Sequence, residues 1–273
     1  MTSGPVVVKI GGTMIEDAAT APALWRAIAD LHRSRPSGVV VVHGGGASVD
    51  RRLEQLGMPT RRREGIRLTP ADQLDEIVSV LAGRLNKSIV AALHRLGVRA
   101  VGLCLGDGDA VPTALSTRFS FDPGRVGDVV DTQTGGASRG PRGENLVGLL
   151  LASGYLPVLS SIGIDREGFL NVNADDAAAG AARVIGASDL VLLTDVAGIL
   201  DGSGRVVESI DSAGIEGLIG SGAITGGMIV KARAAARTAR RLGSPVVILS
   251  GAGAGDLEKW VAGHQAGTRV KPD

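Results

Sequence analysis

The feature that most constrains the fold of this chain is a repeated alternation of short apolar runs with longer stretches of helical composition. The apolar runs are bounded by turn residues and are rich in Val, Ile and Leu, which is typical of buried parallel strands. Strands buried on both faces require helices above and below the sheet. The predicted strands are Val6–Ile10, Val39–Val42, Ala100–Leu105, Leu156–Ser160, Leu190–Leu193 and Pro245–Leu249.

Helix-length stretches rich in Ala, Leu and Arg separate most of these strands. The alternation predicts βαβ units, and therefore an α/β fold with a parallel sheet and helices on both faces. In such sheets ligands bind at the carboxyl ends of the strands. The predicted helices are Ala23–Arg33, Val49–Leu56, Ala71–Leu96, Glu144–Ser153, Asp175–Ile185 and Met228–Leu242.

Two passages interrupt the alternation. Ile164–Leu170 has a turn signal between apolar residues, which predicts a small hairpin. Thr117–Gly143 becomes rich in Gly and Arg and is predicted to be a lengthened hairpin or a loop. The small hairpin lies where one set of βα units passes to the next, so we expect two lobes on one continuous sheet, residues 1–170 and 171–273.

Composition excludes several classes of protein. Hydrophobic residues make up 44% of the 273 residues and the net charge is +1, which excludes disorder and argues against a nucleic-acid or membrane surface. The single cysteine, Cys104, excludes a disulfide scaffold and suits a reducing cytoplasm. The sequence has no uncharged apolar run of the ~18 residues that a spanning helix needs, and a strand-like run at Val6 leaves no place for a signal peptide.

Glycine is unusually frequent, with 41 residues where average usage of about 7% would give roughly 19. Gly11 and Gly12 follow the first predicted strand, and Gly44–Gly46 follow the second. Such loops let backbone N–H groups approach an anion at the start of the next helix. One loop alone is explained equally well by a glycine that ends a strand, but two loops beside Lys9 favour phosphate or carboxylate binding.

The common nucleotide and metal signatures are absent from the sequence. There is no G-x-x-x-x-G-K-[S/T] loop, no G-x-G-x-x-G after the first strand, and no Cys/His cluster with zinc spacing. An ordinary P-loop protein and a Rossmann dehydrogenase are therefore disfavoured. Of the histidines only His43 lies at a strand end beside glycines, and a structural role there is at least as good an explanation as a chemical one.

Several charged residues occupy positions that a bound anion would explain. Lys9 interrupts an apolar strand, where a charge needs a partner or a ligand. Lys231 lies near the start of a predicted helix, where a cation is unfavourable unless an anion is bound. Arg67 has apolar neighbours and its planar fork suits a carboxylate, whereas Arg61–Arg63 are assigned to a solvated turn.

Short polar residues gather at two further strand ends. Asn171, Asn173 and Asp175 lie between the small hairpin and an Ala-rich helix, where Asp175 is either a helix cap or part of a site. Asp195 follows the strand Leu190–Leu193 and either contacts a nucleotide or forms an Asx turn. Both groups fall at the sheet edge where ligands are expected.

Together these motifs resemble the amino acid kinase family, in particular its members that phosphorylate N-acetylglutamate. The resemblance extends from Val6 to Arg269 and agrees in motif order and spacing as well as in content. It implies an open αβα sandwich around a mainly parallel sheet of about eight strands. The motifs that carry it are Lys9–Gly12, His43–Gly46, Gly65–Thr69, Asn171–Asp175, Leu193–Leu200 and Gly227–Lys231.

The resemblance implies transfer of the γ-phosphoryl group of MgATP to the γ-carboxylate of N-acetyl-L-glutamate, which gives an acyl phosphate in arginine biosynthesis. Phosphoryl transfer needs positioning and charge neutralisation more than covalent chemistry. By resemblance, Lys9 bridges the transferring group, Lys231 stabilises the leaving phosphate, and Asp175 holds both lysines. The substrate-binding residues that it implies are Gly11, Gly44, Gly45, Arg67, Asn171 and Asn173.

The resemblance also implies an ATP site in the C-terminal lobe, with Mg²⁺ held mainly by the nucleotide phosphates and no protein metal site. It implies N-acetyl-L-glutamate and ATP as partners, no nucleic acid or membrane, and a cytoplasmic homodimer. The extra N-terminal helix of arginine-inhibited hexameric members is absent, so we expect insensitivity to arginine. The implied ATP-binding residues are Gly12, Asp195, Val196, Ala197, Gly198, Ile199, Leu200, Ala223, Ile224 and Thr225.

Two other interpretations stay open. One is a sibling kinase that acts on a carrier-linked aminoadipate or another acyl amino acid, but Gly65–Asp72 favours acetylglutamate, because a protein carrier would need more basic surface around the site. The other is a non-catalytic ligand sensor on the same fold, which the presence of Lys9, Lys231 and Asp175 argues against. The Asn171–Asp175 signature argues against carbamate, uridylate and glutamate-5-phosphate kinases.

Overall fold

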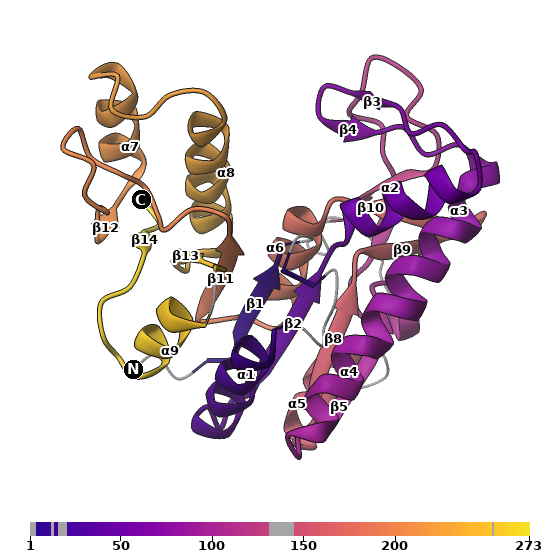
Figure 1. Ribbon diagram of the computed structural model, residues 1–273, viewed down its shortest axis with the longest axis horizontal. Helices are drawn as coiled ribbons and strands as arrows, with labels where there is room; N and C mark the ends of the chain where they lie inside the picture. Colours follow the sequence, from indigo (N-terminus) through magenta and orange to yellow (C-terminus); the bar gives the residue numbers. More distant parts are fainter. Residues whose placement is uncertain (1–3, 12–13, 16–20, 131–144, 253) are drawn as a thin grey trace.

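A twisted sheet forms the centre of the molecule (Figure 1). The computed structural model describes residues 4–273 except 12–13, 16–20, 131–144 and 253. In this part of the chain the sheet has eight strands, in the order β12-β14-β13-β11-β1-β2-β8-β5. Neighbouring strands are parallel except β13 and β14. The strands are β1 (Val6–Ile10), β2 (Val39–His43), β5 (Ala100–Cys104), β8 (Leu156–Ser160), β11 (Asp189–Thr194), β12 (Ser209–Ile210), β13 (Val246–Ser250) and β14 (Thr268–Val270).

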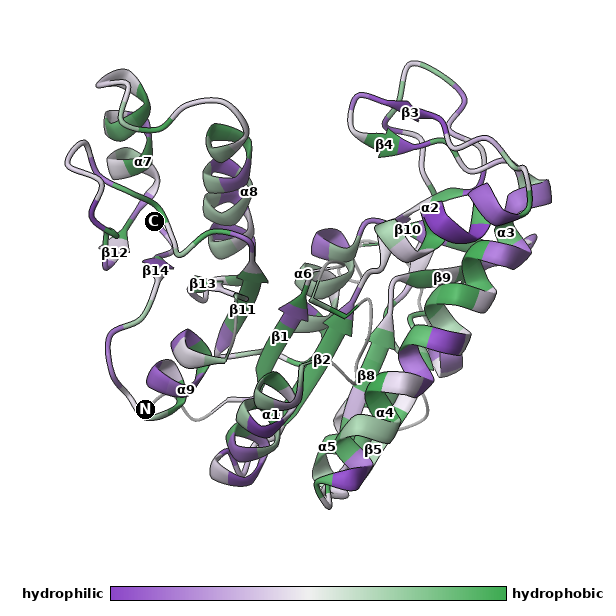
Figure 2. Ribbon diagram, in the orientation of Figure 1, coloured by the Kyte–Doolittle hydropathy of each residue, from purple (hydrophilic) through white to green (hydrophobic). Residues whose placement is uncertain are grey.

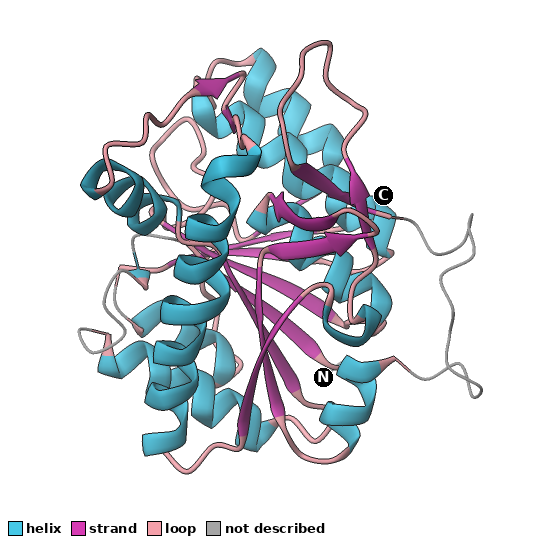
Figure 3. Cartoon of the chain, turned by 90° about the vertical axis from the view of Figure 1, so that its right-hand side faces the viewer, coloured by secondary structure: helices cyan, strands magenta, loops and turns pink. Residues whose placement is uncertain are grey.

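Helices cover both faces of this sheet, as the edge-on view in Figure 3 shows. The predicted α/β sandwich is therefore confirmed, and the strands that were predicted for the sheet lie within one residue of their predicted bounds. One face packs against α1 (Pro22–Ser34), α2 (Gly46–Gln55), α3 (Ala71–Val78), α4 (Asn86–Arg95) and α9 (Gly255–Val261). The other face packs against α5 (Leu146–Ala152), α6 (Ala174–Val184), α7 (Ser212–Gly220) and α8 (Gly227–Leu242).

Strand β1 lies inside the sheet, between β2 and β11. The chain passes from β1 to β2 on one side, whereas β11 on the other side comes from much later in the sequence. The strand order therefore reverses at β1, and open parallel sheets bind ligands at the carboxyl ends beside such a switch point. In the register of the sheet, Lys9 lies between Val42 of β2 and Leu192 of β11.

The two faces of β1 have different partners. Val6, Val8 and Ile10 belong to the core beneath α1, and Val7 belongs to the core beneath α6 and α8. Side chains alternate along a strand, so Lys9 projects on the same face as Val7. Figure 2 shows how apolar the central strands are, with the hydrophilic colours confined to the outer sides of helices, to loops and to a few strand positions.

The segment predicted as the helix Ala71–Leu96 is one continuous helix with an irregular centre. Between α3 and α4 it forms a π-helical turn, η3 (Ser79–Leu85). Such turns are rare and occur frequently at functional sites. Here the turn places Leu81 and Leu85 over the glycine loop that follows β2, where a Cβ on Gly45 would clash with the end of Leu85.

Two smaller sheets stand beside the central one. The first has the order β6-β7-β10-β9 and the second pairs β3 with β4. Antiparallel pairing of β9 with β10 confirms the predicted hairpin at Ile164–Leu170. Strands β6 and β7 form another antiparallel pair, so the segment predicted as a lengthened hairpin or loop, Thr117–Gly143, begins as the loop of a hairpin and continues into β7. Residues 131–143 of that segment lie outside the described residues. The strands are β3 (Arg62–Arg63), β4 (Ile66–Arg67), β6 (Thr113–Leu115), β7 (Val126–Val129), β9 (Ile162–Asp165) and β10 (Gly168–Val172).

The elements that the sequence did not predict are short. Strands β12 and β14 have two and three residues, and helices α7 and α9 have nine and seven. Strands of two or three residues are too short to show an alternation of polar and apolar residues. Their place at the end of the sheet depends on partners elsewhere in the sequence, since β14 pairs with β13 and β12 pairs with β14. Within the described ranges, none of the helices is long and apolar enough to cross a lipid bilayer.

The connection between α9 and β14 gives a prediction for stability. Gly263 (φ +81°) and Gly267 (φ +58°) both have left-handed backbones, but only at Gly267 would a Cβ clash with backbone, at the Ile248 carbonyl of β13. We expect Gly267→Ala to lower the free energy of unfolding by about 2–4 kcal/mol and Gly263→Ala by about 1 kcal/mol, measured by urea denaturation. Equal losses would show that the approach to β13 does not constrain this turn.

Candidate active site

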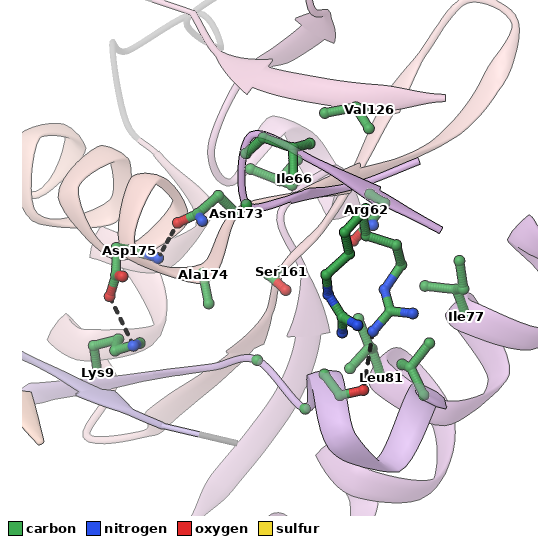
Figure 4. Close-up of a pocket in the computed structure, with 18 of the residues that line it drawn as sticks. Lys9, Arg62, Ile66, Ile77, Leu81, Val126, Ser161, Asn173, Ala174 and Asp175 are labelled. Atoms are coloured by element: carbon green, nitrogen blue, oxygen red, sulfur yellow. Dashed lines mark hydrogen bonds and ion pairs between the residues drawn. The ribbon is translucent and has the colours of Figure 1, made fainter. Parts of the chain in front are cut away.

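The site begins with a positive charge at the end of the central strand. Lys9 is the fourth residue of β1, and its Nζ lies 2.7 Å from Asp175 Oδ1 (Figure 4). Asp175 is not the cap of α6; the cap is Asn173, whose Oδ1 accepts hydrogen bonds from the N–H groups of Asp175 (2.8 Å) and Asp176 (3.3 Å). Asp175 lies in the first turn, where the helix dipole stabilises a carboxylate.

Lys9 and Asp175 together line two cavities on either side of their ion pair. The first cavity has a volume of about 280 Å³ and lies between the glycine loop after β2, the β3–β4 hairpin, the π turn and β10. Lys9, Arg62, Arg67 and Arg118 bring positive charge to it, against the single carboxylate of Asp175. The apolar part of its wall consists of Ile10, Val49, Ile66, Ile77, Leu81, Val126 and Val172.

One carboxylate fixes two of these arginines. Arg67 Nη1 donates to Asp50 Oδ1 and Arg62 Nη2 donates to Asp50 Oδ2, both at 2.6 Å. Arg67 Nη2 also donates to Gly46 O at 3.0 Å. Burial acts to raise the pKa of Asp50, but the hydrogen bonds from Arg67 and Arg62 outweigh it and hold the pKa below its usual value. Asp50 therefore remains a carboxylate and keeps both guanidinium groups in place.

The two arginines are also directly opposite each other in the β3–β4 hairpin. Like charges at opposed positions of an antiparallel pair are destabilising, and an isolated two-stranded hairpin is marginally stable in water. Asp50 neutralises one of the two charges. The remaining positive charge faces the first cavity, where an anionic ligand would complete the cluster.

Polar side chains connect β10 to the segment that carries Arg67. Asn171 lines the first cavity, and its Nδ2 donates to Thr69 Oγ1 at 3.0 Å. Thr69 is fully buried, and its hydroxyl donates to Arg67 O at 3.2 Å. Asn173 lines the same cavity beside Asp175 (Figure 4). These contacts fix the distance between the small sheet and the arginine cluster.

Backbone donors form another side of the first cavity. Gly45 is the N-cap of α2 and Gly46 its first residue, and with Gly44 they line the cavity. Among the described residues, the structure assigns no acceptor to the N–H groups of Gly45 and Gly46. Free N–H groups at the start of a helix bind anions.

The second cavity, of about 460 Å³, lies between β11, β13 and α8. Lys231 Nζ lies 2.7 Å from Thr194 Oγ1 and 2.9 Å from Asp195 Oδ1. The hydrogen bond from Lys231 and then that from Thr194 lower the pKa of Asp195 to about 2, so this carboxylate is ionised at neutral pH. The aliphatic part of the wall consists of Leu190, Leu192, Leu193, Val230, Ala234, Ala235 and Ile248.

The two lysines have separate carboxylate partners. The family resemblance implied that Asp175 holds both of them, but Asp175 pairs with Lys9 and Lys231 pairs with Asp195. Helix α8 begins at Gly227 and carries Lys231 over the carboxyl end of β11, within reach of Asp195. Lys9 and Lys231 nevertheless line the same second cavity.

The structure distributes the remaining predicted residues in three ways. Gly11, expected to bind the substrate, lines the second cavity rather than the first, and Gly12 lies outside the described residues. Ile199 is buried behind the site, and its N–H donates to Thr268 Oγ1 at 2.8 Å. The predicted residues that line neither cavity are Val196, Ala197, Gly198, Ile199, Leu200, Ala223, Ile224 and Thr225.

Other residues of the site were not expected from the sequence. Arg62, assigned to a solvated turn, lines the first cavity together with Arg118 and Ser161. The sequence signal for Arg62 is Gly65, because glycine is typical of two-residue hairpin turns. In the structure Glu64 and Gly65 both have positive φ and form the turn that sets Arg62 opposite Arg67. The positions of Arg118 and Ser161 depend on the small sheet, which sequence periodicity did not indicate.

The carboxylates do not form a metal cage. Among the described residues, no cluster of three or more His, Cys, Asp or Glu side chains could hold a metal ion. Asp175 and Asp195 line the second cavity, and each forms an ion pair with a lysine. A divalent ion at this site would therefore take most of its ligands from a bound phosphate compound and from water.

Comparison with known proteins assigns the class. The Amino acid kinase family matches residues 4–250, so the chain belongs to that family, as its motifs indicated. Acetylglutamate kinase of Proteus mirabilis (strain HI4320) is 41% identical over 267 residues, which cover 97% of this chain and 98% of that protein.

Solved structures share the fold over the whole chain. The Streptococcus mutans UA159 protein smu.665 has a TM-score of 0.72 at 27% identity, with 100% of each chain covered. N-acetylglutamate synthase from Neisseria gonorrhoeae, complexed with coenzyme A and N-acetyl-glutamate, has a TM-score of 0.78 at 22% identity. That match covers 100% of this chain and 60% of the synthase.

Proposed function

We propose that this protein transfers the γ-phosphoryl group of ATP to the γ-carboxylate of N-acetyl-L-glutamate, as an acetylglutamate kinase of arginine biosynthesis. The observation that carries the proposal is that Lys9 and Asp175 line both the arginine-rich first cavity and the second cavity that contains Lys231. A group that passes between ligands in the two cavities must pass Lys9. The 41% identity to an acetylglutamate kinase supports the same assignment.

The acyl amino acid belongs in the first cavity, within the N-terminal lobe of residues 1–170 and the adjoining end of β10. Arg67 binds the α-carboxylate, because its planar fork is oriented by Asp50 and it carries the positive charge that faces the cavity. Asn171 and Asn173 meet the remaining polar groups, and the aliphatic wall meets the methylene groups. A volume of about 280 Å³ suits a small acyl amino acid better than a nucleotide.

ATP belongs in the second cavity, in the C-terminal lobe of residues 171–273. Lys231 is placed to meet its phosphates once Asp195 releases the ammonium group, and Gly11 lies at the mouth beside Lys9. We assign Gly12 and the segments Val196–Leu200 and Ala223–Thr225 to the surroundings of the nucleotide on the family resemblance. Mg²⁺ would be held mainly by the nucleotide phosphates and would supply further neutralisation of their charge.

The chemistry requires charge neutralisation and alignment rather than a base. A carboxylate is ionised at neutral pH and is itself the nucleophile, so no proton has to be removed. Two anions must instead be held against their mutual repulsion. Lys9 stands between them, with Asp175 fixing its position, while the N–H groups of Gly44 and Gly45 bind the developing charge.

We further propose that the protein is a cytoplasmic homodimer. The single cysteine, Cys104, is buried and has no second cysteine with which to form a disulfide within the chain, which suits a reducing compartment. Strand β5 ends the described sheet, so a second copy can pack on this side of the molecule.

The two lysines provide the first test of the proposed reaction. We expect Lys9→Ala and Lys231→Ala each to lower kcat at least ~10²-fold, because each removes a cation that neutralises transferring charge. Lys259→Ala is the matched control, since Lys259 is exposed on α9 and lines neither cavity. Wild-type turnover in both cavity variants would contradict the assignment.

Asp50 provides a test of the first cavity alone. Asp50→Asn leaves two opposed arginines without a neutralising charge, so we expect KM for N-acetylglutamate to rise roughly tenfold while KM for ATP changes little. Asp30→Asn, which disrupts an exposed pair with Arg33 on α1, serves as the control. A rise in KM for ATP instead would show that the acyl amino acid binds outside the first cavity.

The acceptor can be identified by trapping the product. Hydroxylamine converts acyl phosphates to hydroxamates, so an ATP-dependent assay is run with N-acetylglutamate, glutamate, aspartate and aminoadipate. We expect hydroxamate with N-acetylglutamate, since the cavity matches an acylated amino acid with one free α-carboxylate. Formation with another of these acceptors but not with N-acetylglutamate would identify a sibling kinase, and no product with any acceptor would favour a ligand sensor.

A further inference from the structure

His43 ends β2, is fully buried and has no place in the chemistry described above. Both of its ring nitrogens are engaged. Nδ1 lies 2.8 Å from Gly44 O, and Nε2 lies 3.2 Å from Nδ2 of Asn86, the first residue of α4 and equally buried. A polar pair inside the apolar core therefore connects the end of the π turn to the glycine loop of the first cavity.

Two contacts determine which nitrogen of His43 carries the proton: the Gly44 carbonyl can only accept from Nδ1, and the orientation of the Asn86 amide shows what Nε2 does. Asn86 Nδ2 also lies 2.9 Å from Val158 O and 3.3 Å from Leu103 O, which are carbonyl oxygens and can only accept. Lys87 Nζ donates to Asn86 Oδ1 at 3.3 Å, which fixes the amide in the same orientation. Asn86 thus donates to Nε2, and Nδ1 carries the proton and donates to Gly44 O.

The ring is neutral in this arrangement. Protonation would set an Nε2–H against the N–H of Asn86, donor against donor. Burial lowers the pKa of His43 to about 4, although the hydrogen bond to Gly44 acts in the opposite direction. His43 is therefore neither an acid nor a base at neutral pH.

The bond to Gly44 O orients the peptide group that follows. In a trans peptide the carbonyl oxygen and the next N–H point to opposite sides. Because His43 holds the Gly44 oxygen against its ring, the N–H of Gly45 points away from the ring. Gly45 has a φ of +153°, and two successive glycines restrict the rotation of that peptide very little.

The residues around the His43–Asn86 contact leave space for it and exclude it from solvent. On β5, a Cβ at Gly102 would overlap Asn86 Oδ1, so glycine at this position admits the amide. Leu81 and Leu85 of the π turn lie against Gly45. Buried polar groups are costly unless they are hydrogen-bonded, and both side chains of this pair are.

We propose that His43, with its proton on Nδ1, is a positioning residue for phosphoryl transfer, which fixes the Gly44–Gly45 peptide so that the Gly45 N–H meets the transferring group. The Gly44 carbonyl requires the proton on Nδ1, and Asn86 keeps Nε2 unprotonated. The proposal rests on the proposed kinase function for its consequence, but the tautomer and the peptide orientation do not depend on which acceptor is used. His43 itself touches no substrate and moves no proton.

A matched pair of substitutions separates positioning from packing. His43→Asn keeps an amide N–H near the position of Nδ1 and gives up the acceptor for Asn86. His43→Gln keeps an acceptor near the position of Nε2 and gives up the donor to Gly44. We expect the Asn variant to retain kcat within about threefold and the Gln variant to lose at least ~10-fold, with both KM values nearly unchanged.

Thermal midpoints of both variants are measured on the same preparations. If activity follows the midpoints, or if the Gln variant is the more active of the two, His43 is a packing residue and the proposal is overturned. The comparison uses whichever acceptor the wild-type chain phosphorylates.

The tautomer has a spectroscopic readout that does not need turnover. In ¹⁵N-labelled wild-type protein, one of the four histidines should show a protonated Nδ1 and an unprotonated Nε2 that stay unchanged between about pH 5.5 and 8. The signal is assigned by its loss in His43→Asn. A proton on Nε2, or a titration in this range, would overturn the proposal even if the kinase assignment held. The expected spectrum with an inactive wild type would instead count against the kinase assignment.

Discussion

The molecule is organised around a lysine ammonium group at the end of a strand that is otherwise buried on both faces. Such a charge is unfavourable unless it is neutralised, and Asp175 neutralises it at 2.7 Å. Asp175 can do so because the Asn173 cap starts α6 directly behind β10 and the helix dipole favours a carboxylate in the first turn. The reversal of strand order at β1 leaves space on both sides of this ion pair. The two cavities therefore meet at one charge.

The cations of the two cavities differ in how strongly their positions are fixed. In the first, Arg67 is only 9% exposed and is fixed by Asp50 and by the Gly46 carbonyl. In the second, Lys231 pairs with Asp195, whose side chain is 80% exposed, and water screens such a pair strongly. A phosphate can take Lys231 from Asp195 at small cost, whereas a carboxylate meets an Arg67 that is already oriented. In the proposed reaction the acceptor end is thus preorganised and the nucleotide end adjusts to its ligand.

Features that depend on neighbouring residues could be predicted from the sequence, whereas contacts between residues far apart in the sequence could not. The sheet strands were predicted to within one residue because burial on both faces leaves a continuous apolar run. Lys9, Asp175 and Lys231 could be placed because their positions at strand and helix ends are local features. Asp50 and Asn86 could not, since their partners lie 17 and 43 residues away and an isolated Asp or Asn on a helix is normally a solvated residue. Whether Lys231 pairs with Asp175 or with Asp195 depends on how α8 lies over β11, which the sequence does not show.

The glycine surplus, first noted as a composition, has several physical origins. Gly102 admits a buried amide and Gly267 admits a close backbone approach, and neither contributes to binding. The loop after β2 combines glycine with unpaired N–H groups at the first cavity, and there the flexibility of glycine is a disadvantage as well as an advantage. Electrostatic stabilisation works when donors are fixed before the charge develops, yet glycine backbone is the least fixed of all. A loop of this composition therefore needs an external support, and the buried bond from His43 to the Gly44 carbonyl is the support that the described structure provides.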